Sequence, residues 1–232
     1  MERLIMIKEK GISMRTAALI AGIPFMLLTA PYAEFYVFPK LIKYNDAAQT
    51  TQNLLNNPKL FLSGIYAMLF TFLFDIVLAW ALYIFFKPVN ASLALLGAWL
   101  RVVYAVLAIA ALFNFIYVLN LVGLPGIEEA YKHQQVLQLI NAHRSAMNLA
   151  YIIFGIYLIF GGILIYKASY IPNVMGALVI LAGASWIIHS LQPYFFKNYD
   201  LSWVKFFAIG ELVFGIWLLV KGTRIKESEL VV

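Results

Sequence analysis

The segment TFLFDIVLAW, residues 71–80, sets one aspartate, Asp75, in the middle of a long apolar run. The run extends over about residues 60–86, which is more than the ~20 residues that a helix needs to cross a bilayer. A charged side chain at that depth is costly, so such residues face the interior of a helix bundle and have a partner there. The segment therefore predicts a transmembrane helix with a polar inner face, and a partner for Asp75 elsewhere in the chain.

The composition of the whole chain agrees with this prediction. Of its 232 residues, 63% are hydrophobic and 12% are charged, and the mean hydropathy is +0.85. Soluble domains contain about 25% charged residues, so the lipid bilayer is the expected environment and partner of this chain. The absence of cysteine excludes disulfides and thiolate metal sites. The formal net charge of +6 comes with no basic run or RNA-binding motif, so no nucleic-acid partner is expected.

Six apolar runs are each long enough to cross a bilayer. We expect an all-α, polytopic membrane helix bundle, a single domain over residues 1–232, with spans at about residues 16–38, 60–86, 92–119, 146–166, 173–194 and 202–220. Two longer connections each contain a predicted short amphipathic helix. The first, NDAAQTTQNLLNN, has a good N-cap in Asp46. The second, IEEAYKHQQVLQLI, either lies at the interface or runs into the fourth span.

Lys and Arg are slightly more frequent on the side that holds both termini, which favours a cell-membrane protein with cytoplasmic N- and C-termini. The first span has a second interpretation, because TAPYAE after a basic and apolar stretch is typical of a signal peptide cleaved after Ala33. The apolar run continues through FYVF, residues 35–38, so we expect a retained span. Pro24 and Pro31 should bend this span and free backbone carbonyls that need partners inside the bundle.

Depth and helix face predict the partner of Asp75. At a rise of about 1.5 Å per residue, Asp75 lies about 18 Å along its helix from Lys87. Arg101 lies about 20 Å along the next helix from Pro88, and a tight turn joins the two. Small residues recur on the same faces, and such stripes mark where membrane helices approach closely, so we expect Asp75 to face Arg101 near the midplane. The same reasoning predicts close packing of the fourth and fifth spans at Gly155, Gly162, Gly176 and Gly183.

A third ionisable residue, Glu211, falls about 15 Å from the C-terminal end of the last span, at a similar depth. If it joins Asp75 and Arg101, one carboxylate lacks a counter-charge and is a candidate proton carrier. We group Thr71 and Tyr104 with these three as one buried polar cluster. The same residues would also serve as a structural clamp that fixes helix pairing, and the sequence leaves both interpretations open.

A second polar group is expected nearer the opposite side of the membrane, at Glu34, His143, Arg144 and His189. Two histidines and a carboxylate are compatible with a haem or metal site, or with a membrane-embedded enzyme. No H-x-x-x-H or comparable spacing supports either, so we predict no metal and no other cofactor. The chain also lacks nucleotide-binding and nucleophile motifs, so we assign no catalytic residue. The leading hypothesis is small-molecule or proton-linked transport or binding at the buried cluster, with a structural or accessory role as the alternative.

Five stretches carry a resemblance to a known family: RTAALIAGIPFML, NDAAQTTQNLL, FDIVLAWALYIFFKPVNASLALLGAWLRVVYA, YIPNVMGALVILAG and GELVFGIWLLVKG. From about residue 15 to residue 222, the chain resembles an uncharacterised prokaryotic family of six-helix integral membrane proteins, known as a domain of unknown function. The most specific parts of the family pattern fall on Asp75, Lys87, Pro88, Asn90, Arg101, Gly210 and Glu211. The resemblance implies one domain with a retained first helix, and it implies no activity or cofactor.

Overall fold

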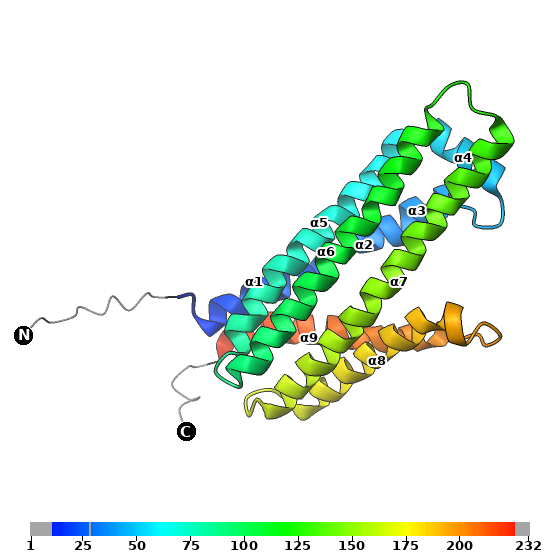
Figure 1. The fold of residues 1–232 in the computed structure, drawn as a ribbon. Helices are drawn as coiled ribbons and strands as arrows, with labels where there is room; N and C mark the ends of the chain where they lie inside the picture. Colours follow the sequence, from blue (N-terminus) through cyan, green and yellow to red (C-terminus); the bar gives the residue numbers. More distant parts are fainter. Residues whose placement is uncertain (1–10, 28, 226–232) are drawn as a thin grey trace, which may run out of the picture.

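The computed structural model describes residues 11–27 and 29–225, and within these residues it is helical with no strand (Figure 1). Six helical segments are long and apolar enough to cross a membrane. The prediction of an all-α, multi-pass membrane bundle is therefore confirmed. Three helices form its long central part: α5 (Pro58–Phe86), α6 (Ala91–Val122) and α7 (Glu129–Lys167). In Figure 1 they run side by side, and α8 (Asn173–Phe195) packs along one half of α7.

A tight turn sets α5 and α6 antiparallel and fixes their relative level. The turn ends at Asn90, whose side-chain oxygen accepts a 2.9 Å hydrogen bond from the backbone N–H of Leu93 and so caps α6. Phe61, Phe72 and Phe85 of α5 are almost fully buried against the neighbouring helices. Because the two helices leave the turn together, residues equally far from it lie at one depth.

The first span is interrupted rather than simply bent. The first segment, α1 (Met14–Met26), ends at Leu27, whose backbone is extended. The chain then forms the short α2 (Thr29–Pro31), a π-helical turn η1 (Tyr32–Val37) and α3 (Phe38–Leu41). Proline has no N–H to donate to the preceding turn, so Pro31 cannot continue a regular helix through this region. The bend expected from Pro24 and Pro31 is therefore a break in the helix near the middle of the membrane.

Two other elements differ in extent from the expected spans. The amphipathic segment before the fourth span is part of α7, which begins at Glu129, so of the two alternatives the segment runs into the span. The last span begins as a 3₁₀-helix, η2 (Ser202–Ala208), and continues as α9 (Ile209–Val220) and a short turn η3 (Gly222–Arg224). Membrane helices tolerate such irregular starts where neighbouring helices cover the backbone, and here η2 packs on α8.

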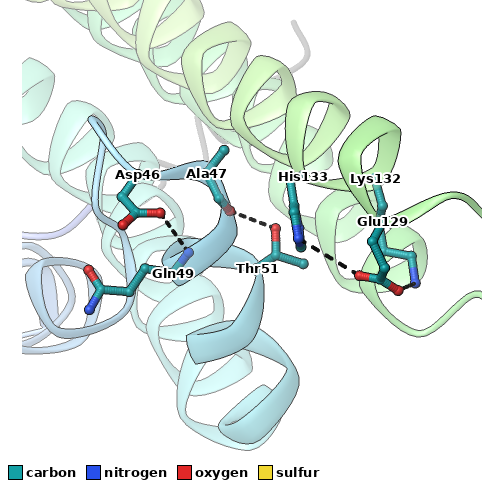
Figure 2. A network of polar contacts seen from close by, with 7 residues as sticks. All are labelled: Asp46, Ala47, Gln49, Thr51, Glu129, Lys132 and His133. Carbon is teal, nitrogen blue, oxygen red and sulfur yellow. Dashed lines mark hydrogen bonds and ion pairs between the residues drawn. The ribbon is translucent and has the colours of Figure 1, made fainter.

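The helix after Asp46 forms as expected, as α4 (Ala47–Asn56). The Asp46 carboxylate accepts a 2.8 Å hydrogen bond from the backbone N–H of Gln49, as an N-cap does. Figure 2 shows α4 beside the first turns of α7, where Glu129 pairs with Lys132 at 3.4 Å. The contact of α4 with α7 covers this end of the bundle, which we call the α4 end.

Both ends of the described chain lie at the opposite end of the bundle, which we call the terminal end (Figure 1). The Arg15 Nε donates a 2.8 Å hydrogen bond to the backbone carbonyl of Ile225, so the first and last described segments are in direct contact. The α5–α6 and α7–α8 turns lie at the same end. An even number of spans requires this arrangement.

Glycine pairs bring α7 and α8 into close contact. A methyl group added to Gly155 would lie 2.5 Å from the carbonyl oxygen of Gly183, and one added to Gly183 would lie 2.5 Å from the carbonyl oxygen of Gly155. Gly162 and Gly176 form a second reciprocal contact one level closer to the terminal end. Small residues are what allow membrane helices to approach so closely.

We expect Gly155→Ala and Gly183→Ala each to lower the melting temperature in detergent, because the new methyl group meets a backbone carbonyl that cannot move independently. Overpacking of this kind costs about 1–3 kcal/mol, which outweighs the better helix propensity of alanine. Gly161→Ala is the matched control on the same helix, since its nearest atom would be 3.9 Å away. Equal melting temperatures for all three variants would contradict the close contact.

Candidate functional site

A cavity of about 420 Å³, the central cavity, lies beside the break in the first span. Its wall includes Pro24, Leu27, Thr29 and Pro31, which flank the break. Irregular backbone at membrane depth is tolerated only where it is buried in protein or lines a cavity, because lipid cannot satisfy its hydrogen bonds. The five residues predicted as a buried polar cluster all line this cavity: Thr71, Asp75, Arg101, Tyr104 and Glu211.

Asp75 and Arg101 form an ion pair between α5 and α6. Both Nε and Nη2 of Arg101 donate hydrogen bonds to Oδ1 of Asp75, the first at 2.9 Å. Both side chains are buried, with 3% of Arg101 and 7% of Asp75 exposed. Asp75 and Arg101 meet because the turn places them at the same depth and because the small residues on the same faces let the two helices approach closely.

Aromatic rings surround the guanidinium of Arg101. Its Cζ lies 4.8 Å from the ring centroid of Tyr157, 5.3 Å from that of Phe154 and 5.9 Å from that of Phe25. The remaining nitrogen, Nη1, is buried and has no hydrogen-bond acceptor at bonding geometry among the described residues, although the Tyr157 hydroxyl is an electrostatic neighbour. A cation over aromatic faces is stabilised by their quadrupoles, so the rings substitute for part of the missing hydration.

Glu211 lines the same cavity but does not join the ion pair. Its Oε1 accepts a 2.6 Å hydrogen bond from the indole N–H of Trp186 on α8. The charges of Arg101 and Asp75 act on it across the cavity. The structure therefore places the three ionisable residues around one cavity, with Asp75 and Arg101 in contact and Glu211 opposite them.

The two remaining members of the cluster contribute a hydroxyl and a ring. The hydroxyls of Thr71 and Thr29 lie 2.8 Å apart, which links α5 to the segment just after the break in the first span. Tyr104 is buried, and its ring centroid lies 4.5 Å from that of Phe154. Both residues thus connect the polar cluster to neighbouring helices.

A second cavity of about 460 Å³, the peripheral cavity, lies towards the α4 end. It is lined by all four residues of the second predicted polar group: Glu34, His143, Arg144 and His189. The guanidinium of Arg144 lies over the ring of Tyr44, with Cζ 5.2 Å from the centroid. Partial burial raises the pKa of the Tyr44 phenol, which nearby Arg144 lowers and Glu34 raises. Opposite charges from η1 and α7 therefore meet at this cavity, beside the phenol of Tyr44.

His143 is anchored by atoms of the neighbouring helix α6. Its Nδ1 donates to the backbone carbonyl of Ala111 at 2.9 Å, and its ring stacks on Phe115 at 3.7 Å between centroids. In residues 11–27 and 29–225, no group of three or more His, Cys, Asp or Glu side chains is arranged to hold a metal ion.

Glu34 and Tyr151 line both cavities, so the two cavities adjoin. Glu34 belongs to the π-helical turn η1, and Tyr151 belongs to α7. Single π-turns inside helices are frequently found at functional sites, because they re-aim side chains that a regular helix would place elsewhere. The shared wall connects the two polar groups, which the sequence predicts as separate groups.

Aromatic residues of the central cavity are the part of the site that sequence reasoning missed. Tyr151, Phe154 and Trp186 line the cavity, and Tyr157 stacks beneath Arg101. Neither spacing nor residue type distinguishes these rings from other aromatic residues in so apolar a chain. The one signal in the sequence for these rings is an acid and a tryptophan at matching depth in neighbouring helices, here Glu211 and Trp186.

Comparison with known proteins gives the following matches. The family described as a domain of unknown function (DUF4386) matches residues 20–222. An uncharacterized protein from Archaeoglobus fulgidus is 30% identical over 173 residues, which cover 75% of this chain and 92% of the relative. No solved structure matches the chain.

We expect Arg101→Leu to destabilise the protein strongly, because it leaves Asp75 buried without its cation. Loss of one partner of a buried ion pair costs about 3–5 kcal/mol. Adding Asp75→Leu to this variant should recover part of the loss, as measured by denaturant unfolding in mixed micelles. Arg144→Leu is the control, since Arg144 is exposed and its contact with Tyr44 contributes at most about 1 kcal/mol. Purely additive losses in the double variant would show that the pair is not coupled.

Proposed function

Because the chain belongs to the DUF4386 family, whose description assigns no function, we propose a function from the geometry of the central cavity. The protein binds a small molecule in this cavity and moves it across the membrane, coupled to the movement of protons. The main observation that supports this proposal is the position of Glu211. Arg101 is already paired with Asp75, and among the described residues no cation lies within ion-pair distance of Glu211. A carboxylate in this position can take up and release a proton as the cavity is filled and emptied.

The volume of the cavity supports binding over a purely structural clamp. Protein interiors are close-packed, and a cavity of about 420 Å³ beside an ion pair is far larger than a packing defect. Small-molecule sites have volumes of about 300–1,000 Å³ with a few polar groups among apolar walls. The pair of Asp75 and Arg101 alone would suffice to fix α5 against α6, and it would need no space next to it.

The break in the first span supports the same proposal. Transporters place their substrates at discontinuous membrane helices, where free backbone groups and helix ends face the site. Here Leu27 and Thr29 flank the break and line the central cavity. The peripheral cavity, which shares Glu34 and Tyr151 with it, supplies a polar route towards the α4 end.

We place the protein in the cell membrane with the terminal end in the cytoplasm and the α4 end outside. The support is the distribution of Lys and Arg, of which Arg15, Lys87, Lys167 and Lys221 stand at the terminal end of their spans. In this orientation the peripheral cavity faces the exterior.

The proton-linked function predicts a specific behaviour of Glu211→Gln. The amide oxygen can still accept the hydrogen bond of Trp186, so the variant should fold. Cationic, anionic and neutral solutes are screened for thermal stabilisation on both sides of neutral pH, since a ligand that binds the folded state raises its melting temperature. Wild-type protein should be stabilised by one class in a pH-dependent way, and Glu211→Gln should lose that pH dependence.

The control variant is Glu128→Gln, which removes an exposed acid before α7. In liposomes that enclose a pH-sensitive dye, the stabilising solute should drive proton movement through wild-type protein and the control, and not through Glu211→Gln. If no solute class stabilises the wild type and no proton moves, the clamp interpretation holds and Asp75 is structural.

The orientation predicts which surface positions react from outside the cell. Gln52→Cys in α4 and Gln134→Cys in α7 lie at the α4 end, and Ser92→Cys and Ser169→Cys lie at the terminal end; all four positions are exposed. The native chain contains no cysteine, so each variant carries a single thiol. A membrane-impermeant maleimide should label positions 52 and 134 in intact cells and label 92 and 169 only after lysis. The reverse pattern would invert the orientation.

A further inference from the structure

The central cavity has a continuous aromatic wall. The ring of Tyr151 stacks on Trp186 at 4.6 Å, Trp186 meets Phe154 at 5.9 Å, and Phe154 packs on Tyr104 at 4.5 Å. Phe72 extends the wall, with its centroid 6.0 Å from that of Tyr104. All five residues line the cavity and come from α5, α6, α7 and α8. Aromatic faces arranged around a space attract cations through their negative quadrupoles.

The charges of the cavity favour the same kind of ligand. Its lining contains three carboxylates, from Glu34, Asp75 and Glu211, and one guanidinium, from Arg101. With all four ionised, three negative charges and one positive charge leave an excess of two negative charges. Arg101 neutralises Asp75 directly, and Glu211 lines the same space with no cation within ion-pair distance among the described residues. An anion would find only Nη1 of Arg101, whose positive charge Asp75 already offsets, whereas a cation would meet the carboxylate of Glu211, which has no cation within ion-pair distance among the described residues.

The cavity also reaches the outer surface of the bundle within the membrane. Three of its lining residues are exposed there: Phe35 of η1 at 82%, Phe74 of α5 at 37% and Leu212 of α9 at 44%. Each is the sequence neighbour of one of the three acids. At the depth of a membrane span this surface meets acyl chains, so the mouth of the cavity is apolar and its interior is acidic.

From these three observations we propose that the central cavity binds a lipophilic organic cation, which enters from the bilayer and exchanges with a proton on Glu211. The proposal rests on the function proposed above and names its substrate class. Protonated Glu211 releases its proton as the cation arrives, and the carboxylate becomes the counter-ion of the cation. The proton leaves through the peripheral cavity, and the net charge of the site is unchanged.

The groups that face Glu211 allow this exchange. From α5, α6, α7 and α8 they are Asp75, Arg101, Tyr104, Tyr151, Tyr157 and Trp186, and from η1 the same cavity is lined by Glu34. Asp75 and Arg101 are paired, Glu34 also lines the peripheral cavity, and the others are neutral donors or rings. Glu211 accepts a hydrogen bond from the neutral indole of Trp186, so it can exchange its proton for another cation without breaking an ion pair that the structure shows.

The test uses two ions of the same size and shape and opposite charge, tetraphenylphosphonium and tetraphenylborate. Binding to the full chain in nanodiscs is measured by equilibrium dialysis, with empty nanodiscs to subtract partition into lipid. Tetraphenylphosphonium should bind at least about tenfold more tightly than tetraphenylborate, and Glu211→Gln should reduce its affinity by about tenfold. Glu128→Gln should bind as the wild type does. In weakly buffered solution the cation should release protons from the wild type and none from Glu211→Gln.

A second variant separates the aromatic contribution from the charge. Trp186→Phe keeps a ring in the wall and Trp186→Leu removes it, while both lose the hydrogen bond to Glu211. Cation binding should therefore be weaker in Trp186→Leu than in Trp186→Phe, by about tenfold for a desolvated cation–π contact. Equal affinities of the two variants would overturn the role of the wall.

The outcomes distinguish this inference from the function on which it rests. Equal binding of the two ions, or cation binding that Glu211→Gln leaves unchanged, overturns the organic-cation assignment. If tetraphenylborate or a neutral solute then drives proton movement that depends on Glu211, proton-linked transport stands with another substrate class. If no solute of any charge gives a response that depends on Glu211, both proposals fail.

Discussion

The ion pair between Asp75 and Arg101 is the interaction on which the rest of the bundle depends. Lipid at that depth cannot solvate either charge, so each must be satisfied inside the bundle. Their contact fixes the rotation of α5 and α6 about their own axes, since turning either helix would expose a charge to lipid. It also draws in the partners of Arg101, because the rings of Phe25 and Tyr157 bring α1 and α7 against the same guanidinium. The central cavity forms because these four helices, packed around Arg101, leave the space beside the break in the first span unfilled.

Much of the fold follows from the sequence because the bilayer imposes lengths that a chain must match. The second, third and fifth spans are close to their expected bounds, since apolar runs between polar turns define them on both sides. The structure differs where backbone geometry overrides hydropathy. The first span is apolar over most of its length, and although its prolines predict a bend, its hydropathy gives no sign that the helix stops at Leu27 and resumes at Thr29. The start of α7 at Glu129 could not be predicted from the sequence either, because a polar amphipathic turn can continue a membrane helix or lie flat beside it.

The ionisable residues of the site were predictable from the sequence, whereas the aromatic residues that line the central cavity were not. Ionisable residues are rare in this chain, so their depths alone bring Asp75, Arg101 and Glu211 to one level. Aromatic residues are common, with 18 Phe, 14 Tyr and 5 Trp, and their presence at a position says little about what they surround. Which rings face the cavity depends on how α7 and α8 cross, and the contacts of Gly155 with Gly183 set that crossing. The recurring glycines predict that the two helices approach closely, but they do not give the crossing angle from which the directions of the aromatic side chains follow.

The π-helical turn η1 has a consequence for the comparison of related chains. A π-turn holds one residue more than a regular turn, so it is equivalent to a single-residue insertion in an α-helix. Deleting Phe35 or Tyr36, which lie between Glu34 and α3, would let the segment close into a regular helix and turn Glu34 by about 100° relative to α3. The change would leave hydropathy and span length almost untouched, yet Glu34 could no longer line both cavities. Within the family, the number of residues in this turn would therefore be a more informative character than the identity of the surrounding residues, because a chain one residue shorter here would have divided cavities instead of joined ones.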